Sequence, residues 1–185
     1  MDTDSEAKFV GSCDLHRAIC SGSLERVKEL VAHGANIEGN CWVGDYACTP
    51  LMYSSEKGHL EITRFLIERG AAVNAQIMIL TSKSVTLHTP GADALTFALL
   101  SDHLDIADLL VQNGADLTKR YADYDETLLM GIVLLGSLRS IDFVLKQGVD
   151  VNERDNLGRT ALDYALAMKR EPEIIELLKA AGATL

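Results

Sequence analysis

The sequence predicts an all-α solenoid, in which short helix-turn-helix units stack in one direction. A pattern recurs five times in 185 residues: a leucine near the start of a short helix, an apolar second helix, and a closing glycine. The separation of these residues is nearly constant, as from Leu15 to Gly34 and from Leu51 to Gly70. Because no single unit can bury its apolar face alone, the units must stack around a common core.

Each unit is expected to begin with a short helix. In the second unit Pro50 fits the first helical turn, where it loses no amide partner, and Thr49 before it fits the N-cap. Small residues recur in these first helices and would let neighbouring helices approach closely: Ala18, Ser54, Ser55, Ala98 and Ala165.

The second helix of each unit is predicted from apolar residues at helical spacing, such as Ile106, Leu109 and Leu110. A glycine then supplies the left-handed backbone that ends the helix. The closing glycines are Gly34, Gly70, Gly114, Gly148 and Gly182.

The first and last units carry polar residues where the middle units are apolar. Arg26 and Glu29 lie in the second helix of the first unit, and Lys179 lies in the second helix of the last unit. A terminal unit needs such a polar outer face, so we expect a complete array with both ends capped.

The second unit has the fullest form of the motif, with Thr49-Pro50-Leu51, Gly58-His59 and Gly70-Ala71-Ala72-Val73-Asn74. These residues resemble an ankyrin repeat, and the resemblance extends over residues 8–185. It implies stacked ankyrin helix-turn-helix repeats joined by β-hairpin turns. It also implies a single ankyrin-repeat domain over residues 1–185, with repeats at about 8–39, 44–75, 88–118, 122–152 and 155–185.

An insertion at residues 76–88 reads as strand, polar turn and strand, which predicts one elongated β-hairpin finger. By alternation, Ile77, Ile79, Val85 and Leu87 would share one of its faces. A ribbon that apolar needs a cover. Either it packs on the earlier insertion, which holds Trp42, or it contacts a partner.

Composition and charge favour a single globular domain and restrict the class of partner. The chain is 48% hydrophobic and 24% charged, with a net charge of −10. This charge argues against nucleic acid, because affinity for phosphates depends on clustered lysine and arginine. We instead expect a protein partner with a basic or amphipathic surface, although surplus acid also simply favours solubility.

No membrane or secretion segment is expected. The chain has no run of about 18 apolar residues, and residues 1–12 are acidic and polar. These features predict a cytosolic or nuclear protein, with the cytoplasm as the first choice. We also expect a monomer.

No motif of a known catalytic site is present. Glycine-rich phosphate loops, Gly-x-Ser-x-Gly elbows and His-Glu-x-x-His helices are all absent from the sequence. The carboxylates of Asp123, Asp125 and Glu126 fall on a turn, where a solvated role is expected. The sequence therefore predicts no enzyme, no cofactor and no catalytic residue.

Four cysteines, Cys13, Cys20, Cys41 and Cys48, lie near the N-terminus. Zinc is an alternative use for them, but their spacing is wider than that of a zinc knuckle. Repeat geometry already accounts for Cys13 and Cys20, and we expect reduced thiols and no bound metal.

The resemblance implies that partners dock on a concave face made of turn tips and first helices. The corresponding helix positions are Glu56, Lys57, Leu100, Leu134, Leu135 and Met168. The tip positions are Tyr46, Tyr121, Tyr124, Glu126, Leu157 and Arg159, and the insertions add Trp42, Ile79 and Val85. Large apolar and aromatic residues at such places favour a protein interface.

One alternative concerns the first helix of the fourth unit. Ile132 and Val133 stand where small residues are usual, so the helix could rotate and bury Leu134 or Leu135.

The sequence thus predicts a non-enzymatic protein–protein interaction module, an adaptor or scaffold. One alternative is an inhibitor or immunity-type factor whose finger blocks a partner enzyme. A zinc-binding regulatory module is the alternative of another class.

Overall fold

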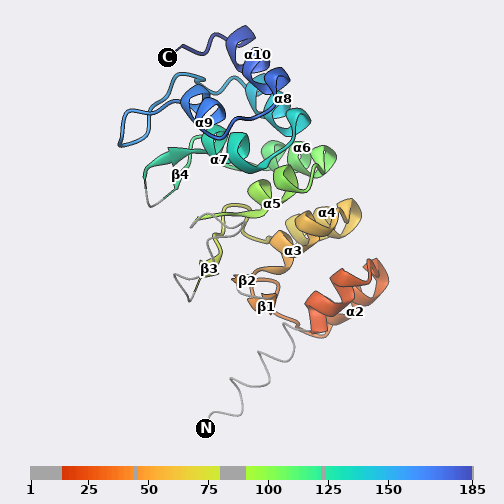
Figure 1. Cartoon of the computed structure of the whole chain (residues 1–185). Helices are drawn as coiled ribbons and strands as arrows, with labels where there is room; N and C mark the ends of the chain where they lie inside the picture. The colour runs from red at the N-terminus through yellow and green to blue at the C-terminus, as the bar shows by residue number, and fades with distance from the viewer. Residues whose placement is uncertain (1–13, 44–45, 80–90, 122–123, 185) are drawn as a thin grey trace.

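The computed structural model describes residues 14–43, 46–79, 91–121 and 124–184, and it shows stacked helix pairs (Figure 1). Residues 14–20 are helical and precede α2 (Leu24–Ala32). The following pairs are α3 (Pro50–Lys57) with α4 (Leu60–Glu68), α5 (Ala94–Leu100) with α6 (Leu104–Gln112), α7 (Leu128–Leu135) with α8 (Leu138–Lys146), and α9 (Ala161–Ala167) with α10 (Pro172–Ala180). The predicted all-α solenoid is confirmed.

The first helices begin where side chains satisfy free backbone amides. Oγ1 of Thr49 accepts a hydrogen bond from the amide of Met52 at 3.3 Å, and Pro50 is the first residue of α3. Thr127 and Thr160 cap α7 and α9 in the same way. The N-cap predicted from the Thr-Pro pair is therefore confirmed, and the aligned positions share its geometry.

The second helices end at glycines with left-handed backbone. The φ angles are +86° at Gly114 and +80° at Gly148, a region that favours glycine. The remaining closing glycines, Gly34, Gly70 and Gly182, have the same sign of φ. Each helix therefore stops where the sequence predicts.

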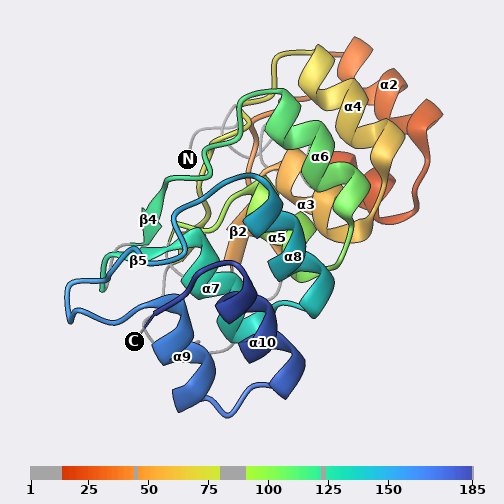
Figure 2. The same ribbon diagram turned by 90° about the horizontal axis from the view of Figure 1, so that it is seen from above.

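The helices form two layers, with the first helices in one row and the second helices in the other (Figure 2). The recurring leucine of each unit lies in the core between the layers, exposed by 2% or less. These residues are Leu15, Leu51, Leu95, Leu129 and Leu162. Burial of the same position in every unit makes one core that runs the length of the array.

Short strands project on the side of the first helices (Figure 1). β1 (Cys41–Val43), β2 (Tyr46–Cys48) and β3 (Met78–Ile79) form an antiparallel sheet, while β4 (Arg120–Tyr121) pairs with β5 (Glu126–Thr127). Because β3 pairs with β2, the start of the predicted finger lies on the earlier insertion. Residues 80–90, which include Val85, lie outside the described residues.

No helix in the described ranges is both long and apolar enough to cross a bilayer.

Candidate protein-binding surface

The turn tips of the fourth and fifth repeats form one cluster around Arg159. Its guanidinium lies over the rings of Tyr124 and Tyr164, 5.4 and 4.6 Å from their centroids. Its Nε donates to Oδ2 of Asp155 at 2.7 Å. Four residues predicted from sequence meet here, and we define the tip platform as Tyr124, Glu126, Asp155, Leu157, Arg159 and Tyr164.

The hydroxyl of Tyr164 holds the two repeats together. It lies 2.7 Å from Oε1 of Glu126 and 2.9 Å from Oδ2 of Asp155, and it accepts from Nη2 of Arg159 at 2.6 Å. Burial and both carboxylates raise the pKa of Tyr164, so the hydroxyl keeps its proton and donates to them. Glu126 belongs to the hairpin before α7 and Tyr164 to α9, so this hydrogen bond joins neighbouring repeats.

The carboxylate of Asp155 shapes the turn that carries Leu157. It accepts the backbone amides of Leu157 and Arg159 at 2.9 and 2.8 Å, and its side chain is fully buried. Burial alone would raise the pKa of Asp155, but hydrogen bonds from Arg159, Tyr164 and Leu157 outweigh it and lower the pKa. The turn is thus ordered around a buried anion.

Two apolar side chains of the tip platform remain open to solvent. Tyr124 is 49% exposed and Leu157 is 61% exposed. The backbone amide of Asn156 donates to the carbonyl of Tyr124 at 2.9 Å, which ties the two tips side by side. The platform therefore presents exposed apolar groups on a frame fixed by ionic and hydrogen bonds.

A second apolar group lies where the first helices of the last two repeats end. Leu135 is 44% exposed, Leu166 44% and Met168 60%, and we define these three residues as the helix-end patch. Nη1 of Arg170 donates to the carbonyls of Val133 and Leu134 at 2.6 and 2.9 Å. The guanidinium thereby fixes the loop after α9 against the end of α7.

The rotation considered for α7 is realised only in part. Ile132 and Val133 are fully buried, and Leu134 is half-buried against the core. Leu135 stays exposed, so one of the two predicted leucines is available to a partner.

The earlier first helices present a different surface. Leu100 is half-buried and packs against the core. Lys57 pairs with Glu56 at 2.9 Å, and its ammonium lies 5.0 Å from the centroid of the Tyr53 ring. The row of first helices therefore changes from charged in the second repeat to apolar in the last two.

Trp42 lies on β1 at the other end of the array and is 39% exposed. Tyr46 and Ile79 face each other in the register of β2 and β3, and the structure describes them by this pairing alone. These predicted residues are far along the chain from the tip platform and form no single site with it.

Tyr121 corrects a prediction, because its side chain is only 2% exposed. Its hydroxyl lies 3.0 Å from Oγ1 of Thr96, and Cε2 of its ring would lie 3.3 Å from a Cβ at Gly131. The ring fills the space that this glycine leaves beside α7. Burial raises the pKa of Tyr121, and the residue belongs to the core, not to a partner surface.

No metal centre is seen in the part of the chain that the structure describes. There, no three histidine, cysteine, aspartate or glutamate side chains gather as metal ligands would. Cys20 is exposed, whereas burial raises the pKa of Cys48 to about 12. A thiol of that pKa stays protonated at neutral pH and is a poor zinc ligand. Cys13 lies outside the described residues.

The carboxylates near β5 are structural. Asp125 pairs with Arg120, whose Nη1 also donates to the carbonyls of Asp125 and Arg154 at 2.9 and 3.0 Å. Asp123 lies outside the described residues. The acids that the sequence places on this turn therefore contribute to the frame of the hairpin.

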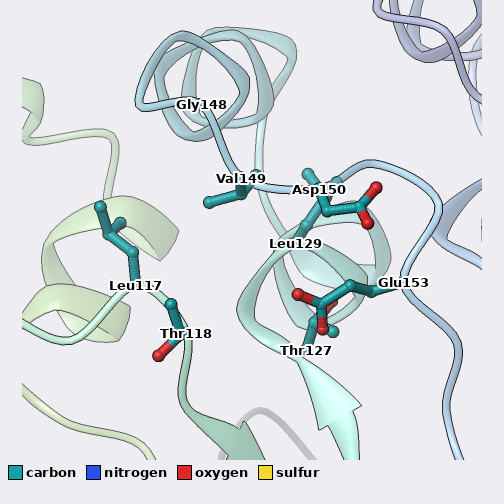
Figure 3. Close-up of a pocket in the computed structure, with 8 residues that line it drawn as sticks. All are labelled: Leu117, Thr118, Thr127, Leu129, Gly148, Val149, Asp150 and Glu153. Atoms are coloured by element: carbon teal, nitrogen blue, oxygen red, sulfur yellow. The ribbon is translucent and has the colours of Figure 1, made fainter.

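A hollow of about 130 Å³ opens between the closing turns of the third and fourth repeats (Figure 3). Its lining comprises Leu117, Thr118, Thr127, Leu129, Gly148, Val149, Asp150 and Glu153. The volume is below that of an ordinary ligand pocket.

Sequence reasoning missed Leu166, Asp155, Tyr164 and Arg170. Leu166 aligns with Leu99 and Val133, which are fully buried, whereas no helix pair in the described residues covers Leu166. The other three act through hydrogen bonds across turns and repeats, which periodicity alone does not indicate.

Comparison with known proteins agrees with this architecture. Residues 15–121 match a family described as ankyrin repeats (3 copies), and residues 130–178 match ankyrin repeats (many copies). These matches leave residues 1–14, 122–129 and 179–185 uncovered.

Similar proteins come from distant organisms. An ankyrin repeat protein of fowlpox virus (strain NVSL) is 29% identical over 159 residues, or 84% of this chain and 43% of the viral protein. Alpha-latrotoxin-Lh1a of Latrodectus hasselti is 30% identical over 190 residues, covering 89% of this chain and 14% of the toxin. Mouse ankyrin repeat and SOCS box protein 6 is 31% identical over 118 residues, covering 63% of this chain and 26% of that protein.

The chain spans less than half the length of each of these relatives. The recurring motif, the stacked helix pairs and the matched profiles agree: the chain belongs to the ankyrin repeat family.

Proposed function

We propose that the chain binds a partner protein through the tip platform and the helix-end patch, as an adaptor or scaffold without catalysis. Ankyrin repeats are generally protein–protein interaction modules. The observation that carries the proposal is the combination of exposed Tyr124 and Leu157 with a hydrogen-bonded frame beneath them.

The physical argument rests on what such a frame does for binding. Aromatic and large apolar side chains supply most of the energy of an interface, and a polar rim excludes water around them. Because Arg159 and Asp155 already fix the tip, binding orders little further structure and loses little entropy.

The partner is proposed to carry a basic or amphipathic surface. The chain has a net charge of −10, so it attracts positive surfaces over a distance of about one Debye length. An interface of ordinary size buries about 800 Å² on each protein. Such an interface would extend over the last two repeats and the residues next to them.

Affinity purification from a native lysate tests this proposal, with the partner identified by mass spectrometry. Leu157→Asp and Leu135→Asp each place a charge on the proposed surface, whereas Ala32→Asp adds the same charge on exposed α2. We expect a partner that wild type and Ala32→Asp retain and that the two surface variants lose by at least tenfold. Retention by all three variants, with helical circular dichroism intact, would remove the surface from consideration.

An assay of the captured partner's own activity separates the proposed adaptor from the alternative of an inhibitor. An adaptor leaves that activity unchanged when the chain is added, whereas an inhibitor lowers it in proportion to occupancy.

A further inference from the structure

The closing turns of neighbouring repeats are joined by a side chain at one recurring position. At the joint between the second and third repeats, Nδ2 of Asn74 donates to the carbonyl of Gly114 at 2.9 Å. Oδ1 of the same residue accepts the backbone amide of Asp116 at 2.9 Å. One carboxamide therefore bridges both a donor and an acceptor of the next turn.

The same bridge is present between the fourth and fifth repeats. Asn152 donates to the carbonyl of Gly182 at 2.9 Å and accepts the amide of Thr184 at 2.8 Å. At the first joint, Oε1 of Glu38 accepts the amide of Ala72 at 2.8 Å, which makes half of the bridge.

The joint between the third and fourth repeats differs from these three. The aligned residue is Thr118, whose hydroxyl turns back and donates to Oδ1 of Asp116 at 2.8 Å, within its own turn. A bridge here would reach the carbonyl of Gly148 and the amide of Asp150. In the described part of the chain, Thr118 bonds only to Oδ1 of Asp116, through both its amide and its hydroxyl.

The hollow lies where this bridge is missing. Figure 3 shows Leu117 and Thr118 on one side of the gap, and Val149, Asp150 and Glu153 on the other. The outer helices agree, because α6 and α8 approach each other less closely than α4 and α6 or α8 and α10. The outer row of the array is thus loosest at this joint.

The first helices are also in less contact here, because α5 and α7 meet over fewer residues than α3 and α5 or α7 and α9. Polar and aromatic contacts at the start of the first helices link the two repeats on this side. Lys119 forms a buried ion pair with Asp93 and donates to Oγ1 of Thr96 at 2.8 Å. The hydroxyl of Tyr121 meets the same Thr96 oxygen. Lys119 follows the closing turn of the third repeat, so its ion pair with Asp93 lies on the third-repeat side of the joint. The contact that crosses the joint is that of Tyr121, whose hydroxyl meets Thr96 of α5 and whose ring fits beside Gly131 of α7.

The far end of the first helices is held as well. Asp102 accepts Oγ of Ser137 at 2.8 Å and Nη1 of Arg139 at 2.6 Å, while Ser140 donates to the carbonyl of Leu99 at 2.6 Å.

Arg120 adds a third link on the hairpin side of the hollow, because it forms an ion pair with Glu153 and donates to the carbonyl of Arg154 at 3.0 Å. The joint is therefore clasped along the first helices and the hairpins, whereas in the described residues no hydrogen bond from Thr118 joins the two outer closing turns.

We propose that the joint between the third and fourth repeats is a hinge. It pivots on the first helices and opens at the hollow, so that the first three repeats and the last two move as separate blocks. Opening there changes the curvature of the inner surface and moves the tip platform relative to Trp42.

Hydrogen exchange of the whole chain, followed by mass spectrometry, tests the hinge through Thr118→Asn. The new carboxamide has the groups that bridge the flanking joints, so it should close the outer row. We expect amides of residues 146–153 to exchange roughly tenfold more slowly than in wild type, the effect of one or two added hydrogen bonds. Thr118→Val, which removes the hydroxyl and adds no bridge, should bring no protection.

The reverse change provides an independent check. Asn152→Thr should make amides of residues 180–184 exchange faster, because it copies the open joint at a closed one. The hinge is overturned if wild-type amides of residues 146–153 exchange as slowly as residues 112–118, or if Thr118→Asn leaves them unchanged. Neither measurement involves a partner, so failure of the proposed binding function would not affect it.

Discussion

Asp155 shows how one buried carboxylate can govern a binding surface. Its side chain is fully buried, yet it stays ionised because backbone and side-chain donors surround it. A protonated Asp155 would accept these hydrogen bonds poorly, and the turn bearing Leu157 would lose its centre.

The lowered pKa of Asp155 predicts a specific pH dependence of stability. A carboxyl group whose pKa is lower in the folded state stabilises the fold above its unfolded pKa of about 3.9. That contribution disappears as the pH falls through the folded value. Wild type should therefore exceed Asp155→Asn in free energy of unfolding at pH 7, and the difference should shrink below about pH 4. Urea titrations across this range measure it, and a constant difference would contradict the assignment.

Single residues mark the limit of what the sequence predicted here. Tyr121 and Tyr124 are close in sequence and both lie beside acids, yet one is buried and the other half exposed. The difference arises because the Tyr121 hydroxyl meets Thr96 and its ring fits beside Gly131. Both contacts lie between repeats, where periodicity carries no information about individual side chains.

At the scale of elements, α7 depends on a residue from outside its own repeat. Gly136 has extended backbone, so the end of α7 lacks the left-handed cap that Gly58 gives α3. Arg170 supplies donors to three carbonyls there, those of Val133, Leu134 and Gly136. The guanidinium also places a positive charge at the negative end of the helix dipole.

Arg170→Lys should therefore destabilise the chain although it keeps the charge. A lysine cannot reproduce the planar fork that reaches three carbonyls, and we expect a loss of about 1–2 kcal/mol in free energy of unfolding. Urea denaturation followed by circular dichroism measures the loss. Arg26→Lys, at the exposed ion pair with Glu29 in α2, serves as the matched control and should change little.

Helix boundaries followed well from local sequence, because caps and closing glycines act within a few residues. The pairing of the insertions did not follow from local sequence. Whether residues 76–79 pair with β2 depends on contacts between segments more than thirty residues apart, and only the structure shows the register of Tyr46 with Ile79. The helix-end patch is similar, since the exposure of Leu166 depends on which helices pack against α9, and the aligned Leu99 and Val133 are buried.

For the whole molecule, stability should spread from repeat to repeat through neighbours alone. Leu178→Ala, at a fully buried position in α10, removes about 2–5 kcal/mol from the last repeat. The loss should unfold the last two repeats before the first three, because the open joint transmits little stabilisation. Circular dichroism should therefore decrease at lower urea than the emission of Trp42, the single tryptophan of the chain.

Val27→Ala, at a fully buried position in α2, is the counterpart at the other end. It should move the Trp42 transition to lower urea than that of the remaining helices. Coincident transitions in both variants would show that the array unfolds as one cooperative unit.

The solenoid itself was predictable because its period is written into the sequence five times. The looseness of the joint between the third and fourth repeats was not predictable, although the sequence shows Thr118 at the position of Asn74 and Asn152. The threonine indicates a missing bridge only once the structure shows that the two asparagines hydrogen-bond to the next closing turn.

The four joints also bear on how such an array can change by gene duplication or deletion. Asn74 and Asn152 reach backbone groups of the next closing turn, the carbonyl of its glycine and the amide two residues later, and every repeat offers both. Asp102 instead reaches the side chains of Ser137 and Arg139 in the fourth repeat. A repeat copied to follow one of the asparagines would therefore find its bridge already in place, whereas one copied to follow Asp102 would need both partner side chains.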